Sequence, residues 1–337
     1  MLKQLIRRLS TRQLVYKENG DPSKVIELVT KELPDTLAAE QILVKWIAAP
    51  INPADLNQIQ GVYPVKPTLP AVGGNEGVGI VEKVGSGVTS LSVGSHVIPN
   101  KSGLGTWREH GIHQQNEVFP IDGDLSVEFA SVLQVNPPTA YRMLKDFVDL
   151  KAGDTIIQNG ANSAVGRQVI QICKVLGVNT VNVVRDRDDL QELVDDLTSI
   201  GATHVITESE LFGRKRKFKG VKLALNCVGG RSALFLASLL DHHGCMVTYG
   251  GMSKQPVQSP TGPLIFKDIS LRGFWMSAWY DRQTSSVKRS EMYKDLAEWM
   301  KSGKLVHPKF TDRKIGQHTE ALEQAATKFD TKQLFRF

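Results

Sequence analysis

The sequence predicts an α/β protein with two domains, one a doubly wound parallel sheet and the other a mostly antiparallel β-rich domain. Three observations support this prediction. The chain has 337 residues, which is long for one hydrophobic core. Its first part contains short strand-like stretches separated by Gly, Pro, Ser and Asn. In its middle part, strand-like and helix-like stretches alternate.

The β-rich domain is predicted at residues 13–135. The stretches QILVKWIAAPI and GVGIVEKVG carry β-branched or alternating apolar residues, and glycine and proline separate them from their neighbours. Residues 57–79, NQIQGVYPVKPTLPAVGGNEGVG, are predicted to form a loop rich in glycine and proline that leads into a strand.

The Rossmann-type parallel-sheet domain is predicted at residues 136–280. TIIQNG is a predicted strand followed by the helix VGRQVIQICKVLG, and TVNVVR is a strand followed by the helix DDLQELVDDLTSIG. This alternation indicates βαβ units. Residues 281–337 contain an amphipathic helix and a tail of mixed pattern, and we expect this segment to pack back on the β-rich domain.

Composition and charge argue against two classes of protein. Hydrophobic residues make up 41% and charged residues 23% of the chain, as in an ordinary globular protein. It contains no run of about 18 apolar residues, so we expect no membrane span. The net charge of +6 falls to +2 without the four basic residues of the segment 1–12, which gives little support for nucleic-acid binding.

The segment 1–12, MLKQLIRRLSTR, is basic and contains no acid. Leu2, Leu5, Ile6 and Leu9 recur at helical spacing between its basic residues. This pattern is typical of a mitochondrial transit peptide, so we predict a location in the mitochondrial matrix. The alternative is a basic chain end with no targeting role.

The turn after the first strand of the parallel-sheet domain is a candidate nucleotide-binding turn. The usual three glycines of such a turn permit a tight bend, close approach of pyrophosphate and close packing of helix on strand. Ala161, Ser163 and Gly166 occupy these positions here. The flanking strand and helix strengthen the interpretation, because N–H groups at the start of a helix can hold a phosphate. The alternative is an ordinary turn between a strand and a helix.

The next strand ends in Arg185, Asp186 and Arg187, which favours NADP(H) over NAD(H) as the cofactor. Guanidinium groups make bidentate hydrogen bonds with phosphate, so two arginines suit a 2′-phosphate. Asp186 weakens this interpretation, since an acid about 20 residues after Gly166 can bind the ribose 2′-hydroxyl of NAD.

No metal site is predicted. Asn75 stands in the tetrapeptide GNEG, where a histidine could bind zinc, but an amide is a poor zinc ligand. His96, His110 and His113 lie nearest to this loop among the histidines and show no ligand spacing.

The order of these motifs resembles the medium-chain dehydrogenase/reductase superfamily. The stretches that carry the resemblance are NGANSAVG, RDRDD, ALNCVGG, YGGMSKQP and LIFKDISLRGFW. Within this superfamily, INPADLNQIQGVYP, LPAVGGNEGVG, GLGTWREH and VNPPTAYRML are similar to the zinc-free mitochondrial trans-2-enoyl thioester reductases. The resemblance covers essentially the whole chain after residue 12.

The resemblance implies a GroES-like catalytic domain, a Rossmann domain that binds NADPH, and no metal. It implies reduction of trans-2-enoyl thioesters, carried by acyl carrier protein or coenzyme A, in mitochondrial fatty-acid synthesis by a homodimer. Tyr63 in GVYP matches the proton donor of this family. The positions that match its NADPH contacts are Asn136, Asn162, Ser163, Ala164, Val165, Arg185, Asp186, Arg187, Tyr249, Gly250, Gly251, Met252, Phe274, Trp275, Met276 and Lys332.

Tyr63 also fits the chemistry, because a phenol with an ordinary pKa of about 10 stays protonated near neutral pH and can donate a proton. The alternative is a turn residue whose ring packs on its loop. Two other functions stay open, an NADPH quinone oxidoreductase of the same superfamily and an inactive nucleotide-binding regulatory protein. The basic run 213–220, GRKRKFKG, is either a solvated loop or a docking surface for an acidic carrier protein.

Overall fold

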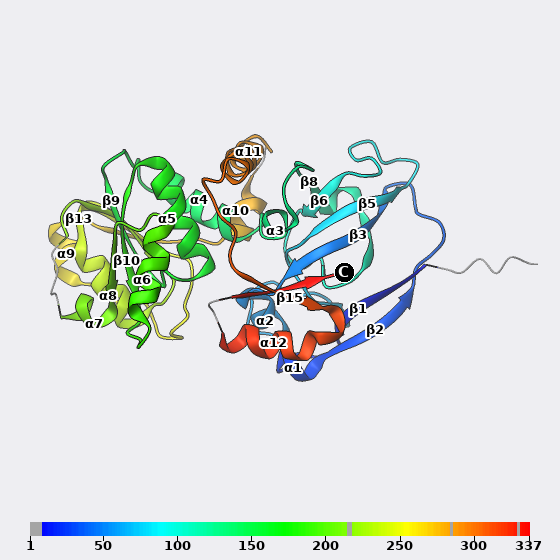
Figure 1. Cartoon of the computed structure of the whole chain (residues 1–337), viewed down its shortest axis with the longest axis horizontal. Helices are drawn as coiled ribbons and strands as arrows, with labels where there is room; N and C mark the ends of the chain where they lie inside the picture. The colour runs from blue at the N-terminus through cyan, green and yellow to red at the C-terminus, as the bar shows by residue number, and fades with distance from the viewer. Residues whose placement is uncertain (1–8, 214–217, 284–285, 329–330) are drawn as a thin grey trace, which may run out of the picture. The chain divides into compact units, whose positions relative to one another are not determined.

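The computed structural model describes residues 9–213, 218–283, 286–328 and 331–337. They divide into two compact units, which are described separately here (Figure 1). The β-rich unit comprises Met1–Val135 and His307–Phe337, and the parallel-sheet unit comprises Asn136–Val306. Residues 1–8 of the predicted transit peptide and residues 214–217 of the basic run lie outside the described residues.

The β-rich unit contains a mostly antiparallel sheet in the order β15-β16-β3-β5-β6-β8, with β7 also paired to β3. A smaller sheet has the order β2-β1-β4. The strands of both sheets are β1 (Ser10–Tyr16), β2 (Ile26–Glu32), β3 (Gln41–Pro50), β4 (Ala71–Val72), β5 (Val78–Val84), β6 (His96–Pro99), β7 (His110–Gln114), β8 (Val118–Pro120), β15 (Phe310–Lys314) and β16 (Lys332–Arg336).

Short helices connect these strands, and the end of the chain completes the core of this unit. The helices are α1 (Pro22–Val25), α2 (Pro53–Ile59), α3 (Val127–Ala130), α12 (His318–Thr327) and the 3-10 turns η1 (Gln115–Glu117) and η2 (Ile315–Gln317). Trp107 and Phe335 are fully buried, and their rings meet edge to face at 5.6 Å. Because β16 carries Phe335 and pairs with β3, residues 307–337 belong to the β-rich unit.

The last residues of the predicted transit peptide belong to a strand of the β-rich unit. Residues 10–12 already lie in β1, where Arg12 pairs with Thr30 of β2. The guanidinium of Arg12 donates to Glu109 Oε1 through Nε at 3.0 Å and through Nη2 at 2.6 Å. The positive charge of Arg12 therefore takes part in an ion pair with Glu109 inside the β-rich unit.

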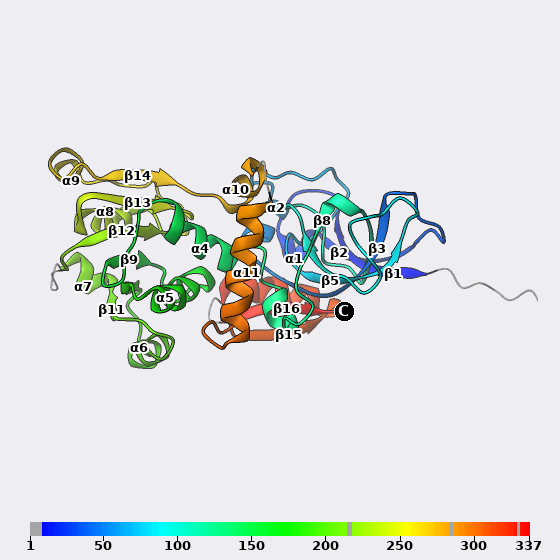
Figure 2. The same cartoon turned by 90° about the horizontal axis from the view of Figure 1, so that it is seen from above.

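The parallel-sheet unit is a doubly wound α/β sheet in the order β11-β10-β9-β12-β13-β14, and every pairing is parallel. Figure 2 shows β14 at the outer edge of this sheet, next to β13. Its strands are β9 (Thr155–Asn159), β10 (Asn179–Val184), β11 (His204–Thr207), β12 (Val221–Asn226), β13 (Leu240–Thr248) and β14 (Ser270–Gly273). This topology and the antiparallel sheet confirm the predicted fold class.

Helices pack on both faces of the parallel sheet, α5 and α6 on one and α8 on the other. The helices of this unit are α4 (Asn136–Asp146), α5 (Ala164–Leu176), α6 (Leu190–Ser199), α7 (Glu208–Phe212), α8 (Gly230–Leu239), α9 (Thr261–Phe266), α10 (Met276–Arg282) and α11 (Val287–Lys301). Ile170 of α5 and Leu197 of α6 share a buried cluster with Val184, whereas Leu236 of α8 belongs to a cluster with Val183. Adjacent residues of β10 thus face opposite layers, as period-two strands require.

The parallel-sheet unit extends further than the sequence suggested, because it ends at Val306 and not at residue 280. The amphipathic helix α11 causes this difference. Its Asp295 accepts a hydrogen bond of 2.6 Å from the hydroxyl of Tyr141 in α4, and its Trp299 ring lies 5.8 Å from the Tyr141 ring. Among the described residues, no helix has the length and apolar character required to cross a bilayer.

Candidate functional site

Tyr63 lies in an irregular segment directly after α2 and is partly buried. The end of this helix fixes the path of the chain toward it. The N–H of Val62 donates to Asn57 O at 3.0 Å, and the side chain of Gln58 donates to Val65 O at 3.2 Å. Gly61 has a φ of +78°, which glycine adopts without steric cost. Hydrogen bonds on both sides of Tyr63 therefore tie this segment to α2.

A buried carboxylate joins α2 to the GNEG segment. Oδ1 of Asp55 accepts hydrogen bonds from the backbone N and side-chain Nδ2 of Asn75, at 2.9 and 2.7 Å. Its Oδ2 accepts from the N–H of Asn52 at 2.7 Å. The Oδ1 of Asn75 accepts in turn from the N–H of Gly103 at 2.6 Å. The side-chain amide of Asn75 thus connects the GNEG segment to Asp55 of α2 and to the loop at Gly103.

Glu76 and Lys332 extend this buried network. Oε2 of Glu76 accepts from Asn52 Nδ2 at 2.8 Å, and Oε1 accepts from the N–H of Val135 at 2.7 Å. Nζ of Lys332 donates to Asn52 Oδ1 at 2.5 Å. Burial raises the pKa of Asp55 to about 6 and that of Glu76 to about 7, because water no longer solvates the charged forms. Burial also lowers the pKa of Lys332, against the attraction of both carboxylates.

The candidate nucleotide turn of the parallel-sheet unit leads into the capped N-terminus of α5. Ser163 is the N-cap of α5, and its hydroxyl accepts from the N–H of Gly166 at 3.1 Å. A Cβ at Gly166 would lie 2.5 Å from Ala161 O, so only glycine allows the helix to pack this close to the turn. The N–H groups of the first helical turn, at residues 164 and 165, point the positive end of α5 at this turn.

Apart from Asn136, which begins α4, the predicted cofactor residues of this unit follow the carboxyl ends of parallel strands. Residues 162–165 follow β9, residues 185–187 follow β10, residues 249–252 follow β13 and residues 274–276 follow β14. These strands and β12 are neighbours in the sheet. Their carboxyl ends lie at the same end of the sheet, where open α/β proteins bind ligands.

Two of the predicted cofactor residues of this unit leave a buried polar atom without a hydrogen-bond partner among the described residues. They are Asn136, at Nδ2, and Tyr249, at its hydroxyl, which lies beside Cys227 and Ser163. A buried polar atom without a partner costs about 1–3 kcal/mol, so a polar ligand here would be stabilising. A Cβ at Gly251 would meet nothing within 4 Å, which leaves the chain after Tyr249 accessible. These features fit a dinucleotide.

The residues after β10 are not equivalent. Within the described part of the chain, Arg185 is exposed and has no hydrogen bond or ion pair. Arg187 forms a bidentate pair with Asp189, with Nη2 at 2.7 Å from Oδ2. Asp186 accepts two hydrogen bonds from Ser209, so its carboxylate is already engaged.

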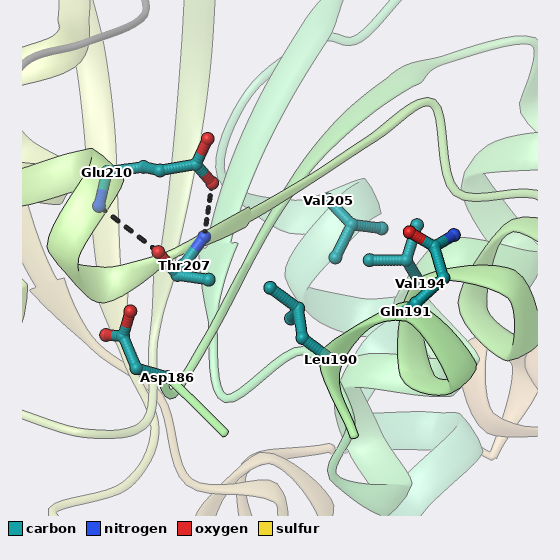
Figure 3. A pocket seen from close by; sticks show the side chains of 7 residues that line it. All are labelled: Asp186, Leu190, Gln191, Val194, Val205, Thr207 and Glu210. Atoms are coloured by element: carbon teal, nitrogen blue, oxygen red, sulfur yellow. Dashed lines mark hydrogen bonds between the residues drawn. The ribbon is translucent and has the colours of Figure 1, made fainter. Parts of the chain in front are cut away.

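A pocket of about 530 Å³ adjoins these residues (Figure 3). It is lined by Asp186, Leu190, Gln191, Val194, Val205, Thr207 and Glu210. In Figure 3, the aliphatic side chains of Leu190, Val194 and Val205 lie on one side, and the carboxylates of Asp186 and Glu210 lie on the side of α7. The pocket was not expected from the sequence, because α6, β11 and α7 each contribute only part of it.

Comparison with known proteins assigns the family. Family models match residues 38–123, described as an alcohol dehydrogenase GroES-like domain, and residues 164–301, described as a zinc-binding dehydrogenase. A mitochondrial enoyl-acyl-carrier-protein reductase of Caenorhabditis elegans is 67% identical over 331 residues, which cover 98% of this chain and 96% of that protein. The chain belongs to the mitochondrial enoyl-acyl-carrier-protein reductase family.

Solved structures agree with membership of the enoyl-acyl-carrier-protein reductase family. The complex of Etr1p with NADP and crotonyl-CoA matches with a TM-score of 0.90 and 35% identity, over 98% of this chain and 100% of that chain. The mitochondrial 2-enoyl thioester reductase Etr1p/Etr2p heterodimer from Candida tropicalis also has a TM-score of 0.90 and 35% identity, with the same coverage. The nucleotide named in the first of these structures is of the type that the sequence predicted.

One of the two matching family models is described as a zinc-binding dehydrogenase. Among the described residues, no group of three or more His, Cys, Asp or Glu side chains is arranged to hold a metal ion. His113 is buried against Trp46, with the rings edge to face at 5.7 Å, and burial lowers its pKa well below the ordinary value.

Sequence reasoning missed a buried amide cluster below the candidate cofactor site of this reductase-family chain. Nδ2 of Asn159 donates to Asn226 Oδ1 at 2.8 Å and to Ser232 Oγ at 3.1 Å. Oδ1 of Asn159 accepts from the N–H of Cys227 at 2.8 Å. The cluster joins the ends of β9 and β12 to α8. The signal was present, since asparagine ends two largely apolar strands, IIQN and LALN.

Proposed function

We propose that this protein reduces trans-2-enoyl thioesters to acyl thioesters with NADPH, as a step of mitochondrial fatty-acid synthesis. The observation that carries the proposal is the 67% identity, over almost the whole chain, with a mitochondrial enoyl-acyl-carrier-protein reductase. The crotonyl-CoA of the Etr1p complex is itself a 2-enoyl thioester, which supports this substrate class.

The reaction adds a hydride to the β-carbon of the substrate and a proton to its α-carbon. NADPH, when bound, supplies the hydride. The residues proposed to hold it include Asn136 and Tyr249, whose buried polar atoms have no hydrogen-bond partner among the described residues, and the first turn of α5, whose N–H groups suit the pyrophosphate. Lys332 is included in the proposed set from the family resemblance alone, and within the β-rich unit its ammonium group donates to Asn52.

We assign the proton transfer to the hydroxyl of Tyr63. A general acid of this kind contributes a factor of about 10² to 10⁴ to the rate. Its backbone is fixed by hydrogen bonds on both sides, which supports a constant placement of the phenol. The family resemblance of the GVYP segment supports this role, and so does the fixed segment.

The preference for NADPH over NADH rests on the residues after β10. The guanidinium of Arg185 is exposed and, among the described residues, unpaired, so it can bind a 2′-phosphate without breaking another contact. The Arg187–Asp189 pair is partly exposed, and such pairs are weak enough for a phosphate to replace the carboxylate.

We further propose that two copies of this chain associate along β14. This strand is the edge of the parallel sheet and is exposed at all four positions. An edge strand with free backbone groups readily pairs with another strand. Leu264, Ile265 and Phe266 of α9 and Leu271 of β14 are exposed apolar residues at the same edge, as a buried interface would use.

One experiment decides among the proposed functions. The purified protein is mixed with NADPH and a medium-chain trans-2-enoyl thioester, on coenzyme A or acyl carrier protein, and loss of NADPH absorbance is followed. We expect rapid oxidation with the enoyl thioester and slow oxidation with NADH or with a quinone. Faster reduction of a quinone would assign the quinone oxidoreductase activity instead. NADPH binding without turnover of any of these substrates would indicate a regulatory protein.

A further inference from the structure

We propose that Ser209 is a positioning residue for cofactor choice, because it holds the carboxylate of Asp186 against α7 and so withholds this negative charge from the 2′-phosphate of NADPH. This inference rests on the proposed function and deepens it. It adds a residue that is distant in sequence from the nucleotide motifs and that does not itself need to touch the nucleotide.

The first observation is that Ser209 engages both carboxylate oxygens of Asp186. The backbone N–H of Ser209 donates to Oδ2 at 3.1 Å, and its hydroxyl donates to Oδ1. These bonds lower the pKa of Asp186, so the group is a carboxylate at neutral pH. In Figure 3 its side chain points toward the turn that carries Thr207. Two hydrogen bonds to one charged group fix its direction.

The second observation is that α7 does not need the Ser209 hydroxyl as its cap. Thr207 is the N-cap, and its Oγ1 accepts from the N–H of Glu210 at 3.2 Å. Glu210 returns a bond, since its Oε2 accepts from the N–H of Thr207 at 3.0 Å. This capping box satisfies the helix start by itself. The hydroxyl of Ser209 therefore serves Asp186, and it lies 2.9 Å from Thr207 Oγ1.

The third observation concerns the neighbouring cations. Asp186 stands between Arg185 and Arg187 in the sequence, yet the structure pairs it with Ser209 instead of a guanidinium. Arg187 contacts Asp189, and Arg185 has no ion pair in the part of the chain that the structure describes. The arrangement keeps one carboxylate away from the cations that are proposed to bind the phosphate.

Without the Ser209 hydroxyl, Asp186 loses the hydrogen bond at Oδ1 and keeps the one from the backbone N–H of residue 209, so its carboxylate is held less firmly and two other positions become available to it. It can pair with a neighbouring guanidinium, or it can approach the ribose, where an acid selects NAD. Either position places a negative charge near the 2′-phosphate and weakens NADPH binding. Neither position weakens NADH, whose 2′-hydroxyl can donate to a carboxylate. Loss of the hydroxyl should therefore change the ratio of the two affinities.

The test uses the full chain with the substitution Ser209→Ala. Dissociation constants for NADPH and NADH are measured from the fluorescence of the reduced nicotinamide. We expect NADPH to bind roughly three- to fivefold more weakly, the size of one partly exposed charge interaction, and NADH to bind as well as before or better. The same contrast is expected between 2′,5′-ADP and 5′-AMP, and it should shrink in high salt.

Two further variants separate positioning from a structural role. In an Asp186→Asn background the carboxylate is gone, so adding Ser209→Ala should leave the NADPH-to-NADH ratio unchanged. Ser199→Ala, at an exposed serine of α6, is the matched control and should change neither affinity. If Ser209→Ala weakens both nucleotides equally, or acts fully in the Asp186→Asn background, the inference is wrong.

Failure of this inference and failure of the proposed function give different results. The nucleotide measurements contain no enoyl thioester, so they do not depend on turnover. Wild-type protein that reduces enoyl thioesters but shows an unchanged ratio in Ser209→Ala would overturn the role of Ser209 alone. Wild-type protein that binds NADH as tightly as NADPH would overturn both the cofactor assignment and this role.

Discussion

Nζ of Lys332 lies 2.5 Å from Oδ1 of Asn52, although 280 positions separate the two residues in the chain. Nδ2 of Asn52 donates to Glu76, so one amide links a cation to a buried carboxylate. Asp55 and Glu76 are both completely buried, and Lys332 is the cation whose charge attracts them. The start of β16 is thereby fastened to the region of α2 within the β-rich unit.

Replacing Lys332 with methionine should destabilise the β-rich unit. The substitution keeps an aliphatic chain but leaves two buried carboxylates without their cation, a change that costs about 3 kcal/mol. We expect the loss to be largest near pH 8 and smaller near pH 5, where the carboxylates take up protons. Urea unfolding at both pH values measures it, with Lys328→Met, at an exposed lysine, as the control. If Lys332→Met and Lys328→Met are equally stable at pH 8, the charge of Lys332 contributes nothing to the free energy of unfolding.

The same network predicts how stability varies with pH. Burial raises the pKa of Asp55 from 3.8 to about 6 and that of Glu76 from 4.5 to about 7. The folded protein therefore binds protons at these two carboxyl groups more tightly than the unfolded chain does. Their contribution to the free energy of unfolding is largest below about pH 4. This contribution falls as the pH rises through 6 and 7.

Glu76→Gln tests this dependence. The variant should be less stable overall, since Asn52 and Val135 donate to different oxygens of Glu76 and glutamine places an NH₂ group against one of these two donors. Its stability should nevertheless fall less steeply between pH 5 and pH 8, by on the order of 2 kcal/mol for the removed group. Glu18→Gln, at an exposed position, should keep the slope of the wild type. If Glu76→Gln does not change how the free energy of unfolding varies with pH, another group causes the pH dependence.

Reversing the charge of Arg185 should alter cofactor choice. Arg185→Glu removes a proposed phosphate contact and adds repulsion, so NADPH should bind at least roughly tenfold more weakly, whereas NADH should change little. Titration of both nucleotides measures the effect. Lys288→Glu, an exposed residue of α11 in the same unit, makes the same change of charge and should affect neither. If Arg185→Glu weakens the binding of NADPH and NADH equally, Arg185 does not act through the 2′-phosphate.

The sequence predicted the features that follow from local pattern and strand order. Alternating strands and helices defined the parallel sheet and pointed to the turn after its first strand, whereas the cofactor positions at 249–252 and 274–276 were named from the family resemblance alone. Contacts between distant segments could not be predicted in this way. Nothing in the local pattern pairs Asn52 with Lys332, or Asp186 with Ser209, since each contact depends on how complete elements pack.

The difference between local pattern and distant contacts also explains why the parallel-sheet unit ends later in the structure than the sequence predicted. The helix at 287–301 was recognised by its amphipathic pattern, but its partner helix α4 begins 151 positions earlier, at Asn136. Its assignment to the parallel-sheet unit therefore required the contact between Tyr141 and Asp295. Likewise, the basic character of Arg12 suggested targeting, and only the fold shows its pairing with Glu109.

Acidic substitutions in α9 should prevent association of two copies. Ile265→Asp and Phe266→Asp together place two charges in the exposed apolar group beside β14. We expect the wild type to sediment as a dimer and this variant as a monomer. Val93→Asp, at an exposed apolar residue of the β-rich unit, should remain dimeric. A monomeric wild type, or a variant that stays dimeric, would contradict the proposed interface.

Tyr63→Phe should reduce turnover without affecting cofactor binding. The substitution keeps the ring and removes the hydroxyl, so a proton donor is lost while packing on the loop is retained. We expect kcat with an enoyl thioester to fall by about 10² to 10⁴, with an unchanged dissociation constant for NADPH. Val62→Ala changes an exposed neighbour in the same segment and should retain nearly full activity. Full activity of Tyr63→Phe would assign the proton to another donor, and equal loss of NADPH binding would indicate a structural role of the hydroxyl.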